Sequence, residues 1–177
     1  MTLIDAKTIK DVALLTEFLM QSNAIEGVYD TKSFDQALEA WSYLITEPKL
    51  TPGVILKTHK ILMLHQKLQP DEKGYFRKVE VSIGWRYGLR YPLVPKAIDS
   101  WCKEANLTVS LKDELNAEGQ LQNTIRADHI AYEKIHPFVD GNGRTGRMFL
   151  NWQRVQCGLD ILVIMEKNKQ AYYQWFD

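Results

Sequence analysis

The chain has 177 residues, of which 45% are hydrophobic and 25% charged, a composition typical of a soluble globular domain with its own core. Lys plus Arg and Asp plus Glu number 22 each, a balance that does not favour a general nucleic-acid binder with a basic surface. No run of apolar residues approaches the roughly 18 that span a membrane. We therefore expect one compact domain, 1–177, that binds neither membranes nor nucleic acids.

The N-terminal half predicts helices. Apolar residues recur at helical spacing over 12–19 and 34–45, and Thr31 or Ser33 is the expected cap of the second segment. Thr51-Pro52 is a typical helix start, a cap followed by proline. The helix that it opens carries His59 on an apolar face, which we interpret as a core histidine with a supporting role near a site as the alternative.

The middle of the chain predicts a short hairpin between helices. Val79, Val81 and Ile83 alternate with polar residues, which indicates a strand, and Gly84 and Gly88 bracket a tight hairpin or flap. Helical spacing resumes at Pro95. The polar stretch 108–119 is expected to be a loop or a short helix.

A strong helical segment, 121–135, leads into His136-Pro137, and the proline disfavours helix at the residue before it. A further helix is expected from near Gly143 to Gly158, where glycine suits a C-terminal cap. A last helix is expected around four aromatic residues, Tyr172, Tyr173, Trp175 and Phe176. The chain stops on apolar residues, which is a hint of a C-terminal extension that the sequence alone does not decide.

Two further features concern the compartment. Cys102 and Cys157 lie far apart without a CxxC pattern, which fits structural thiols in a reducing compartment. The N-terminus lacks the basic start, apolar core and cleavage site of a signal peptide. We expect a cytoplasmic protein.

Of the other histidines, His129 is expected to pack or support the loop after 121–135, and His65 to lie at the surface.

The loop HPFVDGNGRTGR, His136 to Arg147, gathers groups suited to phosphate chemistry. Gly141-Asn142-Gly143 precedes a helix, where unpaired backbone N–H groups bind anions. Arg144 and Arg147 lie three apart, so both can reach polyphosphate oxygens. Asp140 is a hard oxygen ligand for Mg²⁺, and His136 can act as a general base. Alone, each part has an ordinary alternative: a turn, a helix cap or a solvated face. Together they predict phosphate-group transfer.

The same loop resembles the Fic family signature, H-x-F-x-[DE]-G-N-G-R-x-x-R, at every specified position. The resemblance covers roughly residues 50–177 and includes the turn Gly74-Tyr75-Phe76-Arg77 before the expected strand. It implies a mainly α Fic-type helical bundle with a small β-hairpin flap. The N-terminal helices, 1–49, would pack with a Fic core, 50–177, in one domain.

The resemblance also implies roles. His136 would deprotonate a Tyr, Thr or Ser hydroxyl of a target protein, which would attack the α-phosphorus of ATP and release pyrophosphate. Asp140 would hold Mg²⁺, and Phe138 would anchor the loop in the core. The phosphates would be bound by Gly141, Asn142, Gly143 and Arg144, with Arg147 on the γ-phosphate. The family's Doc-type kinases carry a bulkier residue at the position of Gly143, so the glycine favours AMP transfer. The flap, within 80–91, would pair with an extended target segment.

Residues 22–27, SNAIEG, resemble the family's inhibitory motif [ST]-x-x-x-E-[GN], within an inhibitory segment at about 20–28. Its position resembles that of the group whose inhibitory helix precedes the core. Beside Ser22, Glu26 would form a bidentate ion pair with Arg147 and occupy the cation meant for the γ-phosphate. The ordinary alternative is that Glu26-Gly27 simply ends a helix. In some family members the same glutamate helps to remove AMP, and the motif allows this here.

The sequence thus predicts a protein adenylyltransferase that uses ATP and Mg²⁺ and is inhibited by Glu26. The alternatives are a catalytically silent module that binds a nucleotide or a partner, and transfer of UMP or GMP. The target protein is not readable from the sequence, and the chain itself is one candidate. Family members often dimerise, so a homodimer is allowed.

Overall fold

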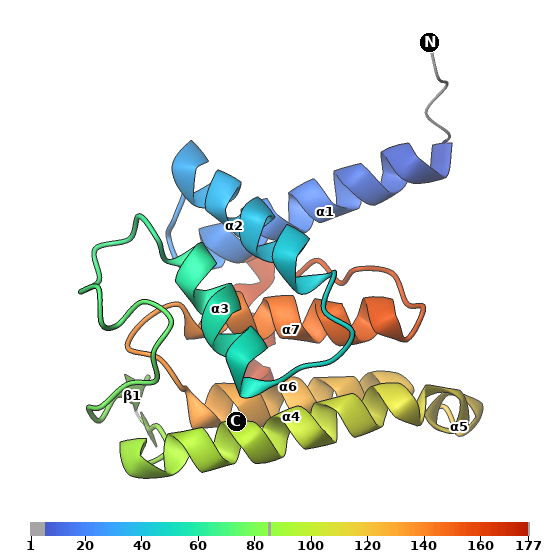
Figure 1. Cartoon of the computed structure of the whole chain (residues 1–177). Helices are drawn as coiled ribbons and strands as arrows, with labels where there is room; N and C mark the ends of the chain where they lie inside the picture. The colour runs from blue at the N-terminus through green and yellow to red at the C-terminus, as the bar shows by residue number, and fades with distance from the viewer. Residues whose placement is uncertain (1–5, 85, 177) are drawn as a thin grey trace.

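The computed structural model describes residues 6–84 and 86–176 (Figure 1). They form a helical bundle with a small flap, as the sequence predicted. The helices are α1 (Ala6–Ile25), α2 (Thr31–Leu44), α3 (Pro52–Leu62), α4 (Val94–Ser110), α5 (Lys112–Ala117), α6 (Leu121–Ile135), α7 (Asn142–Gln156) and α8 (Lys169–Tyr173). Single 3₁₀ turns are η1 (Tyr91–Leu93), η2 (Glu166–Asn168) and η3 (Gln174–Phe176). Within these ranges no helix is both long and apolar enough to cross a membrane.

The flap is an antiparallel pair of two-residue strands, β1 (Ser82–Ile83) and β2 (Arg86–Tyr87). The expected strand over 79–83 is therefore wrong in its first half. Val79 is exposed, and its carbonyl accepts a hydrogen bond from Arg77 Nη1 (2.8 Å) in place of a partner strand. Trp85, at the tip of the predicted hairpin, and the first residues of the N-terminus lie outside the described residues.

α7 lies at the centre of the bundle, between α3 on one side and α6 and α4 on the other (Figure 1). Eleven of its residues are buried, Asn142 and Arg144 to Gln153, because neighbouring helices cover it on all faces. Phe149 is fully buried and its ring contacts those of Trp101 and Tyr132. The packing therefore places the start of α7, and the loop before it, inside the molecule.

The N-terminal helices share this core. Phe18 of α1 packs edge-on against Trp41 of α2, with ring centroids 5.7 Å apart, and α2 packs along α3. Burying side chains of this size contributes roughly 1.5–3 kcal/mol each. That packing holds the last turn of α1 against α7.

Several predicted boundaries need correction. α2 is capped by Asp30 rather than Thr31 or Ser33, because the Asp30 carboxylate accepts from Ser33 N (2.9 Å) and Ser33 Oγ (2.7 Å). The stretch 108–119 comprises the end of α4 and the helix α5. His65 is only partly exposed and its Nδ1 contacts Gln36 Oε1 (2.8 Å), so it is not a free surface residue. Both cysteines are free thiols.

Candidate active site

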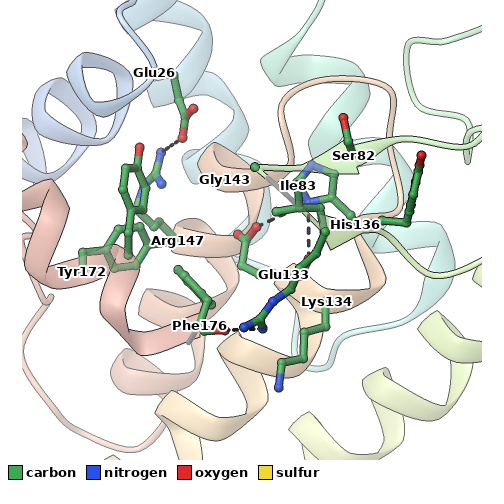
Figure 2. Close-up of a pocket in the computed structure, with 14 residues that line it drawn as sticks. Glu26, Ser82, Ile83, Glu133, Lys134, His136, Gly143, Arg147, Tyr172 and Phe176 are labelled. Atoms are coloured by element: carbon green, nitrogen blue, oxygen red, sulfur yellow. Dashed lines mark hydrogen bonds and ion pairs between the residues drawn. The ribbon is translucent and has the colours of Figure 1, made fainter.

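A cavity of about 660 Å³ opens at the start of α7 (Figure 2). Of the charged groups that the sequence singled out, Glu26, His136 and Arg147 line it, whereas Asp140 and Arg144 do not. Roughly 300–1,000 Å³ is the usual range for small-molecule sites. The end of α1, the flap, the end of α6, the start of α7 and the C-terminal segment contribute to its wall. The main contributors are Glu26, Ile83, Tyr87, Glu133, His136, Gly143, Arg147, Tyr172 and Phe176.

His136 follows the last residue of α6 and has a left-handed backbone, with φ 50° and ψ 65°. It is the single non-glycine residue with positive φ among those described, a conformation that costs free energy and persists only where neighbours enforce it. Arg77 enforces it here. Arg77 Nε donates to His136 O (2.7 Å), Arg77 Nη2 donates to Ile135 O (3.3 Å), and Arg77 N donates to Pro137 O (3.0 Å).

The His136 imidazole is suited to accept a proton. Burial lowers the pKa of His136, so the ring is neutral at physiological pH. Its Nδ1 lies 3.3 Å from the backbone oxygen of Glu133 and 3.8 Å from Glu133 Oε2. With the Nδ1 proton turned toward these oxygens, Nε2 carries the lone pair that a general base requires.

The loop after His136 is braced from inside. Phe138 is fully buried and stacks on His59, with ring centroids 3.6 Å apart. Asn142 Nδ2 donates to Phe138 O (2.9 Å), and Phe138 N donates to Asn142 Oδ1 (2.8 Å). The Asn142 side chain is therefore used within the loop, which leaves its backbone N–H for an anion. Gly141 has φ 80°, and a Cβ there would lie 2.7 Å from Met63 Sδ.

His59 supports the loop from α3. Gly74 N donates to His59 Nδ1 (3.0 Å), so the ring proton is on Nε2, which donates to Asp140 O (2.9 Å). Burial lowers the pKa of His59 to about 4, which keeps the ring neutral. The predicted core histidine is thus also a support of the loop.

Arg144 and Asp140 lie together beside the start of α7. Arg144 is 3% exposed, and its Nη2 lies 3.5 Å from Asp140 Oδ2. Its Nε and Nη1 are buried and find no hydrogen-bond partner within 6–84 and 86–176. A buried cation with unpaired donors is costly, which favours an anionic ligand at this position.

Arg147 is 2% exposed and is held by the end of α1. Its Nε donates to Ser22 Oγ (2.9 Å) and its Nη2 donates to Ser22 O (2.9 Å) and to Glu26 Oε1 (2.7 Å). Figure 2 shows the Glu26 carboxylate next to the Arg147 guanidinium, with a dashed line for their contact. The expected contact is present, but it runs through one guanidinium nitrogen and is not bidentate, because Ser22 takes the Nε donor. A Cβ at Gly143 would collide with Glu26 Oε1, so the carboxylate also lies over the start of α7.

The model of the Fic/DOC family matches residues 49–153. This chain belongs to the Fic/DOC family. It is 27% identical over 180 residues to the protein adenylyltransferase Fic of Drosophila willistoni, covering 99% of this chain and 33% of that protein. The chain thus spans about a third of the length of this curated relative.

Solved structures show the same Fic fold. A Fic domain-containing signalling protein from Bacteroides thetaiotaomicron superposes with a TM-score of 0.76 at 18% identity, over 98% of this chain and 75% of that one. The BepC protein of Bartonella tribocorum, solved with bound AMPPNP, superposes with a TM-score of 0.50 at 18% identity, over 89% and 74% of the two chains.

Reasoning from the sequence missed Glu133 and Gly146 entirely, and it named Arg77 without giving it a role in this Fic site. Arg77 was grouped with the family turn but received no role, because nothing local indicates that a guanidinium will reach carbonyls 59 residues away. Glu133 falls one helical turn before His136, and this i, i+3 spacing is the signal that could have found it.

Proposed function

We propose that the chain transfers AMP from ATP to a Tyr, Thr or Ser hydroxyl of a protein, and that Glu26 holds the site inhibited. One observation carries the proposal: the neutral His136 and the Arg147–Glu26 pair face each other across a single cavity at the start of α7. The name of the Drosophila relatives, protein adenylyltransferase, and the AMPPNP in the BepC structure support ATP as the nucleotide.

In the proposed reaction His136 Nε2 takes the proton of the acceptor hydroxyl. The hydroxyl oxygen then bonds to the α-phosphorus, the bond from that phosphorus to the bridging oxygen breaks, and pyrophosphate leaves. Negative charge on the phosphates would meet the backbone N–H groups of Asn142 and Gly143 and the unpaired nitrogens of Arg144, whereas the N–H of Gly141 donates to Asp140 Oδ1 (2.6 Å). Arg147 would bind the γ-phosphate once Glu26 releases it.

The family also implies Mg²⁺, and the residues present fit it. No cluster of three or more His, Cys, Asp and Glu side chains that could hold a metal occurs in the described part of the chain. Mg²⁺ with nucleotides, however, is commonly held by one or two carboxylates, waters and the phosphates themselves. Asp140 would supply that carboxylate, because its side chain is 58% exposed beside Arg144. The ion would neutralise phosphate charge.

Inhibition follows from the position of the Glu26 carboxylate. It places a negative charge on the cation that would bind the γ-phosphate, and it fills the space over Gly143. A nucleotide must therefore displace Glu26 or bind with its phosphates shifted, and either outcome separates the α-phosphorus from His136.

The test is a labelling experiment with ATP labelled at the α- or the γ-phosphate, Mg²⁺ and a cell lysate. Four proteins are compared: wild type, Glu26→Gly, Glu26→Gly with His136→Ala, and Glu26→Gly with His65→Ala as the matched histidine control. We expect label from the α-phosphate only, strongest in Glu26→Gly, retained with His65→Ala and lost with His136→Ala.

Three results would overturn the proposal. Label from the γ-phosphate would indicate phosphate transfer. Label that appears only with UTP, GTP or CTP would indicate a different nucleotide. No label from any nucleotide, in proteins that still bind ATP, would indicate a silent binding module. If wild type removes AMP from a target that was labelled beforehand, the same site would also catalyse the removal of AMP.

A further inference from the structure

Glu133 is a buried carboxylate on the cavity wall that the proposed reaction has not used. It is 8% exposed and lies beside His136 at the end of α6 (Figure 2). Its Oε2 is 3.8 Å from His136 Nδ1, whereas its Oε1 is buried and finds no hydrogen-bond partner in the part of the chain that the structure describes. A buried carboxylate with an unpaired oxygen destabilises a fold, so its presence favours a functional reason.

The helix opposite makes room for this carboxylate. Gly146 lies in the interior of α7, where glycine is a poor helix former, and a Cβ at Gly146 would overlap Glu133 Oε1. The glycine also lies close to α6 through its carbonyl, which contacts His129 Nδ1 (3.1 Å). Each residue alone is unfavourable for stability, the buried acid Glu133 and the helical glycine Gly146, but the space left by the glycine holds the carboxylate.

We propose that Glu133 is a positioning residue for His136, and that Gly146 is a glycine so that the Glu133 carboxylate fits. The inference rests on the proposed AMP transfer, in which His136 is the base. The carboxylate and the backbone oxygen of Glu133 keep the Nδ1 proton turned inward and Nε2 toward the cavity. The carboxylate also stabilises the imidazolium that forms when Nε2 takes the proton.

The other charged groups near Glu133 and His136 come from the turn before the flap, the end of α1, the loop after His136 and α7. His136 is also influenced by Arg77 from the turn before the flap, by Glu26 from the end of α1 and by Asp140 from its own loop. Arg77 lowers the pKa of His136, whereas the two carboxylates raise it. Among the charged side chains of the described residues, Glu133 is the one that forms an ion-pair contact with the ring.

Glu133 itself is faced by Arg147 from α7 and by Glu26 from α1. Burial raises the pKa of Glu133 to about 7, with Arg147 acting in the opposite direction and Glu26 adding to the rise. Because the folded-state pKa is raised, the stability that this group contributes is present below its unfolded pKa and is lost as pH rises through about 7.

The first experiment measures AMP transfer in the Glu26→Gly background with Glu133→Gln, which keeps the shape and removes the charge. Glu39→Gln, on the exposed face of α2, is the matched charge control. We expect kcat to fall at least roughly tenfold with the KM for ATP unchanged, as for loss of a group that orients a histidine base. The control keeps the parent kcat.

A second measurement needs no activity. The chain has four histidines, and His136→Ala identifies the imidazole signals of His136 in an NMR titration. We expect the His136 signals of wild type to show a second titration step at about pH 7, where Glu133, 3.8 Å away, loses its proton, and we expect Glu133→Gln to lack this step. Thermal stability of Glu133→Gln should match wild type at pH 5 and exceed it at pH 8, so that a loss of transfer cannot come from unfolding.

The Gly146→Ala variant tests the space for the carboxylate. It should lower kcat like Glu133→Gln, and it should cause no further loss when combined with Glu133→Ala. Gly53→Ala in α3 is the matched control, because a Cβ there makes only an ordinary 3.7 Å contact.

The outcomes separate this inference from the proposed function. If His136→Ala abolishes transfer but Glu133→Gln leaves both kcat and the titration curve of His136 unchanged, only the positioning role is wrong. If Glu26→Gly transfers no nucleotide at all, AMP transfer is wrong, and an unchanged titration curve of His136 in Glu133→Gln would then also overturn the coupling proposed here.

Discussion

The loop around His136 and the end of α1 meet at Arg147, but they are held in place very differently. The loop is fixed by its own hydrogen bonds through Asn142, by the stack of Phe138 on His59 and by the donors of Arg77. The end of α1 is held by core packing, and its polar contacts with the site are the bonds that Ser22 and Glu26 form with Arg147.

From this difference we infer how the proposed inhibition could be relieved without loss of the site. A loop braced from within keeps its shape whether or not α1 contacts it. A carboxylate that is 35% exposed and held by a single hydrogen bond can be displaced by a competing anion such as a nucleotide phosphate. The comparison predicts that changes in the loop supports damage both stability and transfer, whereas changes at the end of α1 chiefly release transfer.

The largest effect is expected from Arg77→Met. It removes the donors to the carbonyls of Ile135, His136, Val79 and Leu89, and unsatisfied buried carbonyls are costly. We expect about 3 kcal/mol lower stability by chemical denaturation and at least roughly a hundredfold slower transfer in the Glu26→Gly background. Arg154→Met is the control, because Arg154 donates one exposed bond to a backbone carbonyl. Normal transfer in Arg77→Met would show that the strained backbone of His136 does not need this clamp.

Glu26→Gln should have the next largest effect, and in the opposite direction. It keeps the side-chain size and removes the charge from a charge-assisted bond, so AMP transfer should rise roughly tenfold to a hundredfold over wild type. Stability should change little, because the carboxylate is partly exposed. The measurement is initial-rate labelling from α-labelled ATP. A rate equal to that of wild type would show that occupation of space over Gly143, and not charge, causes inhibition.

Ser22→Ala should release transfer more weakly. The variant loses the neutral Ser22 Oγ acceptor for Arg147 Nε but keeps the backbone acceptor and Glu26, so we expect roughly a threefold rise. Ser42→Ala is the matched control, since Ser42 is exposed and its Oγ donates to Leu38 O within its own helix, α2 (2.8 Å). A rise as large as that of Glu26→Gln would mean that Ser22 is the main holder of Arg147.

The smallest effect is expected from Gly27→Ala, which tests how firmly the end of α1 is set. Gly27 has φ 72°, and a Cβ there would meet no atom within 4 Å, so the cost is purely conformational. We expect stability to fall by about 1 kcal/mol and transfer to change less than roughly twofold. A larger release of transfer would show that the turn itself, and not the two side chains, positions Glu26.

The helical fold and the place of the loop between two helices could be predicted from the residues of the chain alone. Helix periodicity and caps depend on residues three or four apart, and the groups from His136 to Arg147 are continuous in the chain. For that reason the end of α6 at His136 and the start of α7 near Gly143 were predicted close to where the structure has them. The residues 22–27 were recognised only through the family resemblance, since no local rule relates Glu26 to an arginine 121 residues away.

Only the tertiary structure decided which distant groups meet. The packing of α1 against α7 determines that Ser22 takes the Nε donor of Arg147, so that Glu26 forms one bond and not two. The packing of α6 against α7 brings the carboxylate of Glu133 over Gly146, and the turn before the flap carries Arg77 to the carbonyls around His136. These contacts depend on how whole helices pack, and helix packing is determined by side chains spread over the entire core.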